Sequence, residues 1–260
     1  MTVPRKGHSK IADIPPDLLE DLNAGTVPSA SLSEGLAVDF SQLLRSAFPE
    51  LPPEAFEAGD GAMSLGVTRR MEAFGEILLL HRGIESLPGL IAHPSDTVRG
   101  WACYMIGLTP KLRLKERLDL LRPLADDAHF GVREWAWIPM RRHISMNVRN
   151  AVAALKPWTK EKSVNLRRYA VEATRPRGVW ATHIEQLKHN PEMGLPLLEP
   201  LKADPEKYVQ DSVGNWLNDA AKSQSEWVSS ICTRWRQESS NAATERICDR
   251  AMRSVSRRRR

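Results

Sequence analysis

The sequence has few cysteines. Its 260 residues include Cys103, Cys232 and Cys248, and none of them forms a CxxC pair. An odd number of widely spaced cysteines argues against a disulfide framework and a cysteine zinc site, and is typical of a reducing cytoplasm. The seven histidines show no metal-ligand spacing either. We therefore expect no metal and no other cofactor.

Long apolar runs are also missing. No segment approaches the roughly 18 apolar residues that a membrane helix needs, so no membrane partner is expected. The N-terminal residues lack the apolar centre of a secretory signal, which predicts a cytoplasmic protein. There is no GxGxxG, P-loop or GxSxG motif, which argues against the common nucleotide-binding and serine-hydrolase classes.

Positive charge, by contrast, is in excess. Lys and Arg number 37 against 32 Asp and Glu, and the sequence pI is about 9.2, which favours an anionic partner. The hydrophobic fraction of 42% indicates a globular chain. We expect residues 1–15 to be disordered, residues 16–255 to form a single domain, and residues 256–260 to form a basic tail.

A helical repeat occupies much of the chain. Four segments align: TVRGWACYMIG, GVREWAWIPMR, NLRRYAVEATR and YVQDSVGNWLN. Their first apolar residues are Val98, Val132, Leu166 and Val209, which are 34, 34 and 43 residues apart. The longest step holds an insertion at 175–182. An amphipathic helix precedes each segment, and an Asp stands shortly before three of the second helices: Asp96, Asp127 and Asp204. This pattern is typical of HEAT-like repeats.

The fold class follows from this repeat and from the absence of strand alternation. The sequence predicts an all-α, HEAT-like repeat α-solenoid, a curved superhelix of helix pairs. Before the repeats, helices are expected over 31–48 and 67–80. After them, a terminal helix pair is expected over 227–255.

The repeat register predicts a functional surface. In a solenoid the second helices of successive pairs lie side by side, so equivalent positions form columns. One column contains Glu134, Arg168 and Asp211, and the positions one helical turn beyond it contain Glu172 and Asn215. We expect a shared patch of Glu134, Arg168, Glu172, Asp211 and Asn215. Four tryptophans stand near it in the sequence: Trp135, Trp137, Trp180 and Trp216.

Many of these residues also have a structural interpretation. Arg168 and Glu172 are four residues apart and can form an ordinary helix salt bridge. Repeated arginines can form a ladder with aspartates between repeats, and tryptophans can belong to the core. The ladder candidates are Arg99, Arg133 and Arg167, and the core candidates are Trp101, Trp135 and Trp158. The terminal arginines can be a solvated end that adds non-specific phosphate attraction.

Six segments, taken in order, carry a family resemblance. They are LNAGTVPSASLSEGLAVDF (22–40), VTRRMEAFGEIL (67–78), HPSDTVRGWA (93–102), VREWAW (132–137), RRYAVEATRPRGVW (167–180) and YVQDSVGNWLNDAAK (208–222). Together they resemble the AlkC branch of the AlkC/AlkD-like bacterial DNA glycosylases. The most specific part is the Glu-x-x-Arg-Pro-Arg-x-x-Trp end of the fifth segment.

The resemblance implies a monofunctional DNA glycosylase of base excision repair. Its expected substrates are 3-methyladenine and 7-methylguanine in double-stranded DNA. We expect a bacterial, cytoplasmic, nucleoid-associated monomer. The implied catalytic residues are Glu134, Glu172 and Asp211. The expected lesion contacts are Trp135, Trp137, Arg168, Trp180, Asn215 and Trp216, the last replacing a His of some members. The expected DNA-backbone contacts are Arg99, Arg141, Arg142, Arg175 and Arg177.

Carboxylates suit this chemistry. An N3- or N7-alkylated purine is cationic and already a good leaving group, so it needs little general-acid help. The enzyme must stabilise an oxocarbenium-like sugar and position a water, and a carboxylate can do both. Indole faces can contact the cationic base. The alternative is a non-catalytic HEAT-repeat module that binds DNA or protein.

Overall fold

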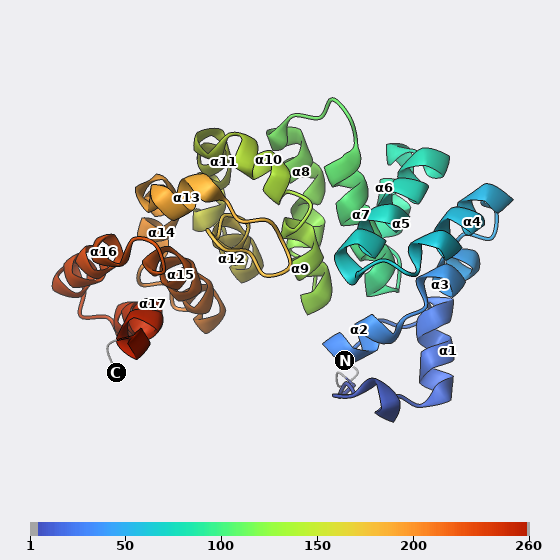
Figure 1. The fold of residues 1–260 in the computed structure, drawn as a ribbon, viewed down its shortest axis with the longest axis horizontal. Coiled ribbons are helices and arrows are strands. Elements are labelled where there is room, and N and C mark those ends of the chain that lie inside the picture. Colours follow the sequence, from blue (N-terminus) through green and yellow to red (C-terminus); the bar gives the residue numbers. More distant parts are fainter. Residues whose placement is uncertain (1–4, 259–260) are drawn as a thin grey trace. The chain divides into compact units, whose positions relative to one another are not determined.

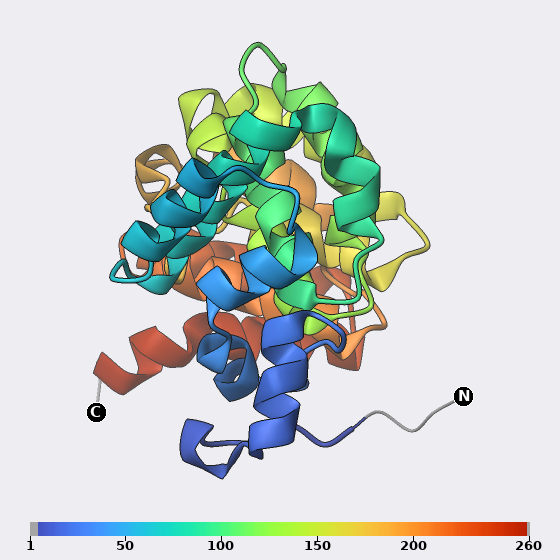
Figure 2. The same ribbon diagram turned by 90° about the vertical axis from the view of Figure 1, so that its right-hand side faces the viewer.

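The structure, a computed structural model, describes the backbone of residues 5–258 and the side chains of residues 5–255. Within this part every regular element is a helix (Figure 1, Figure 2), which confirms the predicted all-α class. The chain divides into two compact units, whereas the sequence predicts one domain over 16–255. Unit 1 contains the described residues up to Leu112 and Asp127–Pro139, and unit 2 contains Arg113–Asp126 and the described residues from Met140. The side chains of the predicted tail, 256–260, lie outside the described part.

Unit 1 is a set of short helices around an aromatic core. Its elements are η1 (Ile11–Asp13), α1 (Pro16–Ala24), α2 (Leu32–Ala37), α3 (Phe40–Ala47), α4 (Pro53–Ala62), α5 (Val67–Arg82), η2 (Ile84–Ser86), α6 (Leu87–Ile91), α7 (Asp96–Leu108) and α9 (Phe130–Trp137). Helix α7 packs against both α5 and α9. The Trp101 ring stacks on Phe74 at 5.0 Å between ring centres and meets Phe40 edge-on. Trp101 is therefore a core residue.

The segment 31–48 forms two helices, not the single helix that its apolar spacing predicts. Val38 adopts a non-helical conformation between α2 and α3. The Asp39 side chain then accepts a hydrogen bond from the Gln42 amide and caps α3. An aspartate before a helical apolar run is a strong helix start, so the capping bond here prevails over the helical period.

Residues 5–15 lie in the segment that composition predicts to be disordered, but here they are attached to α2. The fully buried Glu34 carboxylate accepts two bonds from the Arg5 guanidinium at 2.8 and 2.6 Å. It also accepts the His8 amide at 2.9 Å and the Ala30 amide at 2.7 Å. Arg5 holds the pKa of Glu34 well below its ordinary value, although burial opposes this. One buried carboxylate thus anchors the N-terminal segment; residues 1–4 lie outside the described part.

Replacing Glu34 with Gln should destabilise the protein by about 2 kcal/mol. This is less than the ~3–5 kcal/mol of a fully buried pair, because Arg5 is 38% exposed and water screens its charge. A lowered pKa stabilises the folded state above the ordinary Glu range, and this stabilisation fades as pH falls through the folded pKa. The difference between wild type and variant in urea unfolding should therefore shrink in acid. The exposed Glu20→Gln serves as control, and an equal effect of both variants would contradict the assignment.

Unit 2 continues the helical repeat. Its elements are α8 (Leu114–Ala125), α10 (Arg141–Met146), α11 (Val148–Leu155), η3 (Lys156–Lys160), α12 (Val164–Glu172), α13 (Glu185–His189), η4 (Pro191–Gly194), α14 (Leu195–Leu198), η5 (Glu199–Leu201), α15 (Lys207–Ala221), α16 (Ser225–Glu238) and α17 (Ala242–Arg258). Helix α15 packs against α12, α16 and α17. The last two helices form the predicted terminal pair. Trp158 is buried beside Tyr169, as expected of a core residue.

The arginine after the first apolar residue of each repeat plays the same part in both units. Arg99, Arg133 and Arg167 each donate to the carbonyl oxygens five and six residues earlier, at 2.6–2.9 Å. Arg99 also pairs with Asp127 at 2.8 Å, and Arg167 with Asp204 at 2.7 Å. These bonds confirm the HEAT-like repeat and, for Arg99 and Arg167, the predicted ladder with aspartates. They also correct the expectation that Arg99 contacts DNA, because its guanidinium is committed within unit 1.

Candidate functional site

The two leading candidate carboxylates belong to different units, so each is described within its own. In unit 1, Glu134 lies on α9 and is half-buried. The helix begins at His129, whose ring accepts the Gly131 amide at 3.1 Å and also bonds the Ser29 carbonyl oxygen at 2.6 Å. Trp137 donates its indole N–H to Glu134 Oε2 at 3.0 Å. The start of α9 and the direction of the carboxylate are thus both fixed.

The tryptophans of α9 differ in exposure. Trp137 is only 3% exposed, so the expectation that it contacts a lesion is corrected: it orients Glu134. Trp135 is half-buried, and a Cβ at Gly100 would come within 2.9 Å of its ring. The Trp135 ring lines a small pocket with Phe130, which is 38% exposed one helical turn before Glu134. Trp135 keeps a surface that a ligand can reach.

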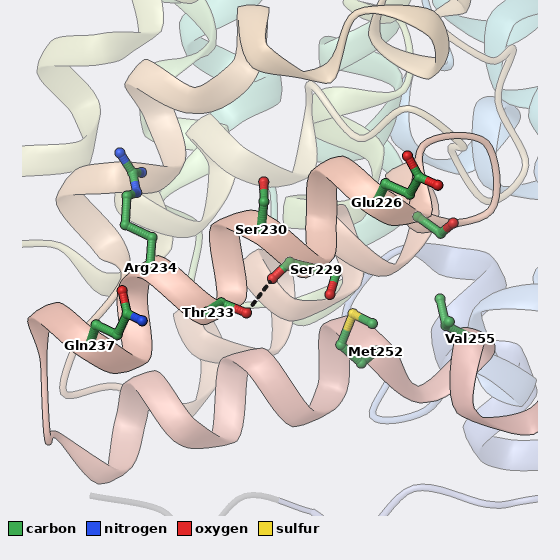
Figure 3. A pocket seen from close by; sticks show the side chains of 9 residues that line it. Glu226, Ser229, Ser230, Thr233, Arg234, Gln237, Met252 and Val255 are labelled. Atoms are coloured by element: carbon green, nitrogen blue, oxygen red, sulfur yellow. Dashed lines mark hydrogen bonds between the residues drawn. The ribbon is translucent and has the colours of Figure 1, made fainter.

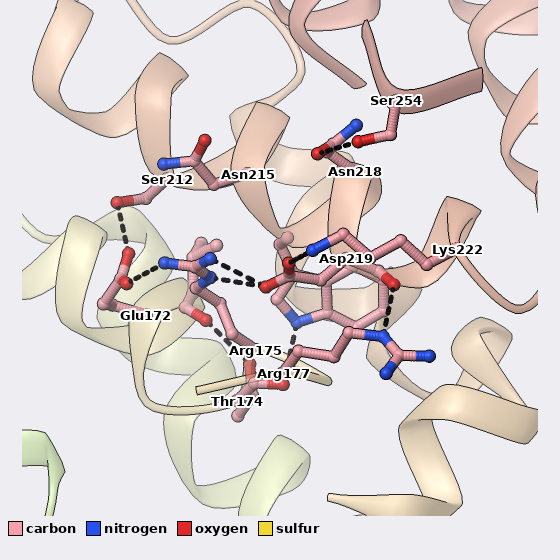
Figure 4. Close-up of polar contacts among 12 residues, drawn as sticks. Glu172, Thr174, Arg175, Arg177, Ser212, Asn215, Asn218, Asp219, Lys222 and Ser254 are labelled. Carbon is pink, nitrogen blue, oxygen red and sulfur yellow. Dashed lines mark hydrogen bonds and ion pairs between the residues drawn. The ribbon is translucent and has the colours of Figure 1, made fainter. Parts of the chain in front are cut away.

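In unit 2, Glu172 ends α12 as a buried carboxylate that is 4% exposed. Arg175 donates to Oε1 at 2.7 Å and the Ser212 hydroxyl donates to Oε2 at 2.8 Å (Figure 4). Arg168 Nη2 lies 3.7 Å from Oε2, so the expected salt bridge on the helix is confirmed. The Arg168 guanidinium also stacks over the Tyr208 ring at 4.5 Å.

Burial and the arginines act on Glu172 in opposite directions. Burial raises the pKa of its carboxyl group, whereas Arg168, Arg175 and the two hydrogen bonds lower it. The arginines prevail, and the pKa lies below the ordinary value. Glu172 is therefore a fixed, buried negative charge at neutral pH.

Arg175 connects Glu172 to a second buried carboxylate, that of Asp219. Its Nε and Nη2 atoms lie 2.9 and 2.7 Å from Asp219 Oδ2 (Figure 4). With 12% of its side chain exposed, Arg175 is a bridge inside unit 2, which corrects the expected role as a DNA-backbone contact. Arg177 is half-buried and donates to the Asp219 carbonyl oxygen and to Ser223 Oγ.

The sequence register placed the wrong face of α15 toward Glu172. Asp211 pairs with Arg246 at 2.6 Å and with Arg250 at 3.1 Å, both on α17. Asn215 Oδ1 likewise accepts bonds from α17, from Arg250 and Arg253. The expected column through Glu172, Asp211 and Asn215 is therefore corrected. The repeat register itself is kept, since Gln210 Nε2 donates to the Asp204 carbonyl oxygen six residues earlier, as Arg167 does to Glu161.

Three α15 residues that the sequence analysis missed do face the Glu172 cluster. They are Tyr208, Ser212 and Asp219, through the contacts with Arg168, Glu172 and Arg175. They are spaced by four and seven residues, which is one helical face. That spacing is the sequence signal that identifies them.

Trp180 and Trp216 lie in opposite environments. Trp216 is fully buried, and its indole N–H donates to the Thr174 carbonyl oxygen at 2.9 Å. The expectation that it contacts a lesion is corrected, because it has no accessible surface. Trp180 is 52% exposed, in the loop between α12 and α13, with a φ of +59°. It is the most exposed of the four tryptophans named as lesion contacts.

Adjacent arginines on α10 also differ. Arg141 is 1% exposed and donates only to carbonyl oxygens in its identified bonds, those of Thr182 and Ala173. Burial, reinforced by the nearby Arg175, lowers the pKa of Arg141 to about 10. A buried guanidinium cannot meet a phosphate, which corrects the expected role. Arg142 is exposed and remains a candidate for phosphate contact.

A further pocket of about 490 Å³ lies between α16 and α17 (Figure 3). Ser229, Ser230 and Thr233 line it, together with Met252 and Val255. None of the expected site residues lines this pocket. Among the described residues, no group of three His, Cys, Asp or Glu is arranged to hold a metal ion. In the same part of the chain, no helix combines the length and apolar character of a membrane span.

Both the sequence and the fold of this chain are similar to those of known proteins. Residues 132–246 match the family model of DNA alkylation repair enzymes. The fold is similar to that of the Pseudomonas fluorescens alkylpurine DNA glycosylase AlkC bound to DNA containing an abasic site analog. The TM-score is 0.68 at 23% identity, over 84% of this chain and 61% of that one. The family match covers less than half of the chain, and the solved structure shows a shared fold.

Two further proteins are similar to this chain. AlkD2 from Streptococcus mutans matches with a TM-score of 0.53 at 21% identity, over 82% of this chain and 96% of that one. The uncharacterized protein YhaZ of Bacillus subtilis (strain 168) is 31% identical over 117 residues, 45% of this chain. The chain covers 32% of the length of YhaZ. Below 25% identity, the two structures establish a shared fold.

Proposed function

We propose that this chain is a DNA glycosylase that hydrolyses the N-glycosidic bond of cationic alkylated purines. Its main substrate is 3-methyladenine, and 7-methylguanine is a second substrate. Its partner is double-stranded DNA that contains the lesion, bound by a monomer in the cytoplasm, in association with the nucleoid. One observation carries the proposal. Within the region that matches DNA alkylation repair enzymes, Glu172 is a buried carboxylate that two arginines keep ionised.

Glu172 supplies charge in this proposal. Arg175 and Ser212 occupy its two oxygens, so it is poorly placed to take a proton from water. A fixed carboxylate stabilises the positive charge that develops on the sugar as the base leaves, and it needs no reorganisation during the reaction. Two properties of Glu172 support this role: its side chain is buried, and the pKa of its carboxyl group is lowered.

Glu134 positions the water. It is half-buried and keeps contact with solvent, while the Trp137 N–H fixes one oxygen. A general base must reach both its substrate water and bulk solvent, to which it passes the proton. Asp211 is a less suitable candidate for this step, because Arg246 and Arg250 engage it.

Trp180 is the proposed contact with the cationic base. Its exposed indole can approach a cationic ring face-on, and this attraction grows when the contact excludes water. Trp135 is the corresponding candidate in unit 1. Arg142 is the proposed phosphate contact.

The rate of base release should depend on pH in a way that reports Glu172. Because its pKa is lowered, the acidic limb of the pH profile should lie below the ordinary Glu range of about 4.3. In Arg168→Met, the strongest contribution that lowers this pKa is removed, so the limb should move to higher pH. Single-turnover rates between about pH 3 and 8, corrected for spontaneous depurination, measure this. An unchanged limb in Arg168→Met would assign the limb to another group.

The function itself is tested with methylated genomic DNA. Mass spectrometry of the soluble fraction should detect free 3-methyladenine, and more slowly free 7-methylguanine, above an enzyme-free control. DNA binding without any release of base would instead support the non-catalytic DNA-binding module.

A further inference from the structure

The loop between α12 and α13 is built around the Arg141 side chain. The Ile184 amide donates to the Pro176 carbonyl oxygen at 3.0 Å and closes the base of the loop. From inside, Arg141 Nε and Nη2 donate to the Thr182 carbonyl oxygen at 2.9 and 2.7 Å, and Nη1 donates to that of Ala173 at 3.3 Å. One guanidinium therefore ties together the two ends of the loop.

The loop also packs directly on this guanidinium. A Cβ at Gly178 would come within 2.9 Å of Arg141 Cζ and 3.0 Å of its Nε. The two following residues form the tip, where Val179 is 56% exposed and Trp180 52% exposed. Two large apolar side chains are thus held in water at the end of a loop whose interior is filled.

The backbone at the tip is in an unfavourable conformation. Trp180 has a φ of +59°, a region that bulky residues rarely adopt and that persists only when the surroundings enforce it. Trp180 lies between two residues that contact Arg141. Gly178 packs on the Arg141 guanidinium, and the Thr182 carbonyl oxygen accepts a hydrogen bond from it. The planar fork of arginine can do this, whereas a lysine ammonium is a single point charge on a flexible stem.

We propose that Arg141 is a positioning residue that holds the Val179–Trp180 tip preformed for an apolar contact with DNA at the lesion. The clamp is a property of unit 2 alone. The DNA contact rests on the proposed glycosylase function. Preforming the tip removes the cost of ordering it when DNA binds.

The clamp is tested first without DNA, by hydrogen–deuterium exchange of the peptide that spans 176–184. In Arg141→Lys, this peptide should exchange at least about tenfold faster than in wild type, while core peptides of α15 are unchanged. The neighbouring exposed Arg142→Lys is the matched control and should stay within about twofold. Unchanged exchange in Arg141→Lys would overturn the proposal. If that variant does not fold, Gly178→Ala, which displaces the loop from an intact Arg141, should give the same loosening, and unchanged exchange there would equally overturn it.

The positioning role is tested second, on methylated DNA. Arg141→Lys and Trp180→Ala should each lower kcat about tenfold, and the double variant should be no slower than Trp180→Ala alone, because both act through one contact. The salt dependence of DNA affinity should not change in Arg141→Met, since Arg141 meets no phosphate. In Arg142→Ala its slope should fall by about 0.9. Multiplying effects in the double variant, or a reduced slope in Arg141→Met, would overturn the positioning role. If wild type released no base, the proposed glycosylase function would be wrong. The hydrogen–deuterium exchange experiment would still test whether Arg141 holds the loop.

Discussion

Glu172→Gln is expected to lower the rate of base release about a hundred- to a thousand-fold, with duplex affinity changed less than about threefold. The variant removes the buried negative charge that we propose to face the developing sugar cation. It leaves the size of the side chain unchanged. Single-turnover release on a saturating lesion duplex measures the effect, since product release does not enter it.

The Gln side chain can keep the hydrogen bonds around it. Its amide oxygen can accept from Arg175, and its amide nitrogen can donate to the Ser212 hydroxyl, which is free to rotate. Folding should therefore survive. Ser212→Ala is the matched control, because it removes one bond and keeps the charge, and its loss should stay within about tenfold. Near-wild-type release by Glu172→Gln would remove this residue from the chemistry.

Glu134→Gln is expected to be the second most damaging change, lowering base release about a hundredfold through loss of the water-positioning base. Trp137→Phe keeps Glu134 and removes the indole N–H that directs this carboxylate, together with part of a buried ring. It should cost less, about tenfold, since the base remains but is less well oriented. Both rates are measured on the same duplex with saturating enzyme, so that weaker binding does not contribute.

The order of these two variants of α9 is itself informative. If Trp137→Phe were as slow as Glu134→Gln, the indole would have a part beyond orientation. If neither changed the rate, the catalytic apparatus would lie within unit 2 alone. In either case, circular dichroism must show that α9 and its neighbours remain folded, because Trp137 is buried.

The helical scaffold was predictable because its repeats carry local signals. The Arg99 and Arg167 positions follow an apolar residue and precede an Asp of the next repeat, and their bonds are the same in both units. Glu172 was also predictable, since it lies one turn beyond Arg168 on the same helix. The break in 31–48 was not, because a single capping bond from Asp39 outweighed the helical period.

Part of the candidate site could not be obtained from spacing. Arg141 and Arg142 are adjacent and chemically identical, yet one is buried inside a loop and the other is exposed. Only the path of the 175–182 insertion separates them. On α15, likewise, Ser212 contacts Glu172 while Asp211 pairs with α17, although Gln210 keeps the bond of the repeat's arginine position. The spacing predicts the type and register of a helix but not which neighbouring helix each of its side chains contacts.

The most direct test of the central claim counts both products of one reaction. Methylated DNA is incubated with wild type and with the Glu134→Gln/Glu172→Gln double variant, and free purines and abasic sites are quantified in the same samples. We expect wild type to produce as many abasic sites as free 3-methyladenine and 7-methylguanine molecules together, and the double variant to produce neither above background, although it still binds the duplex. Equal release by both proteins, or binding by wild type without release, would contradict it.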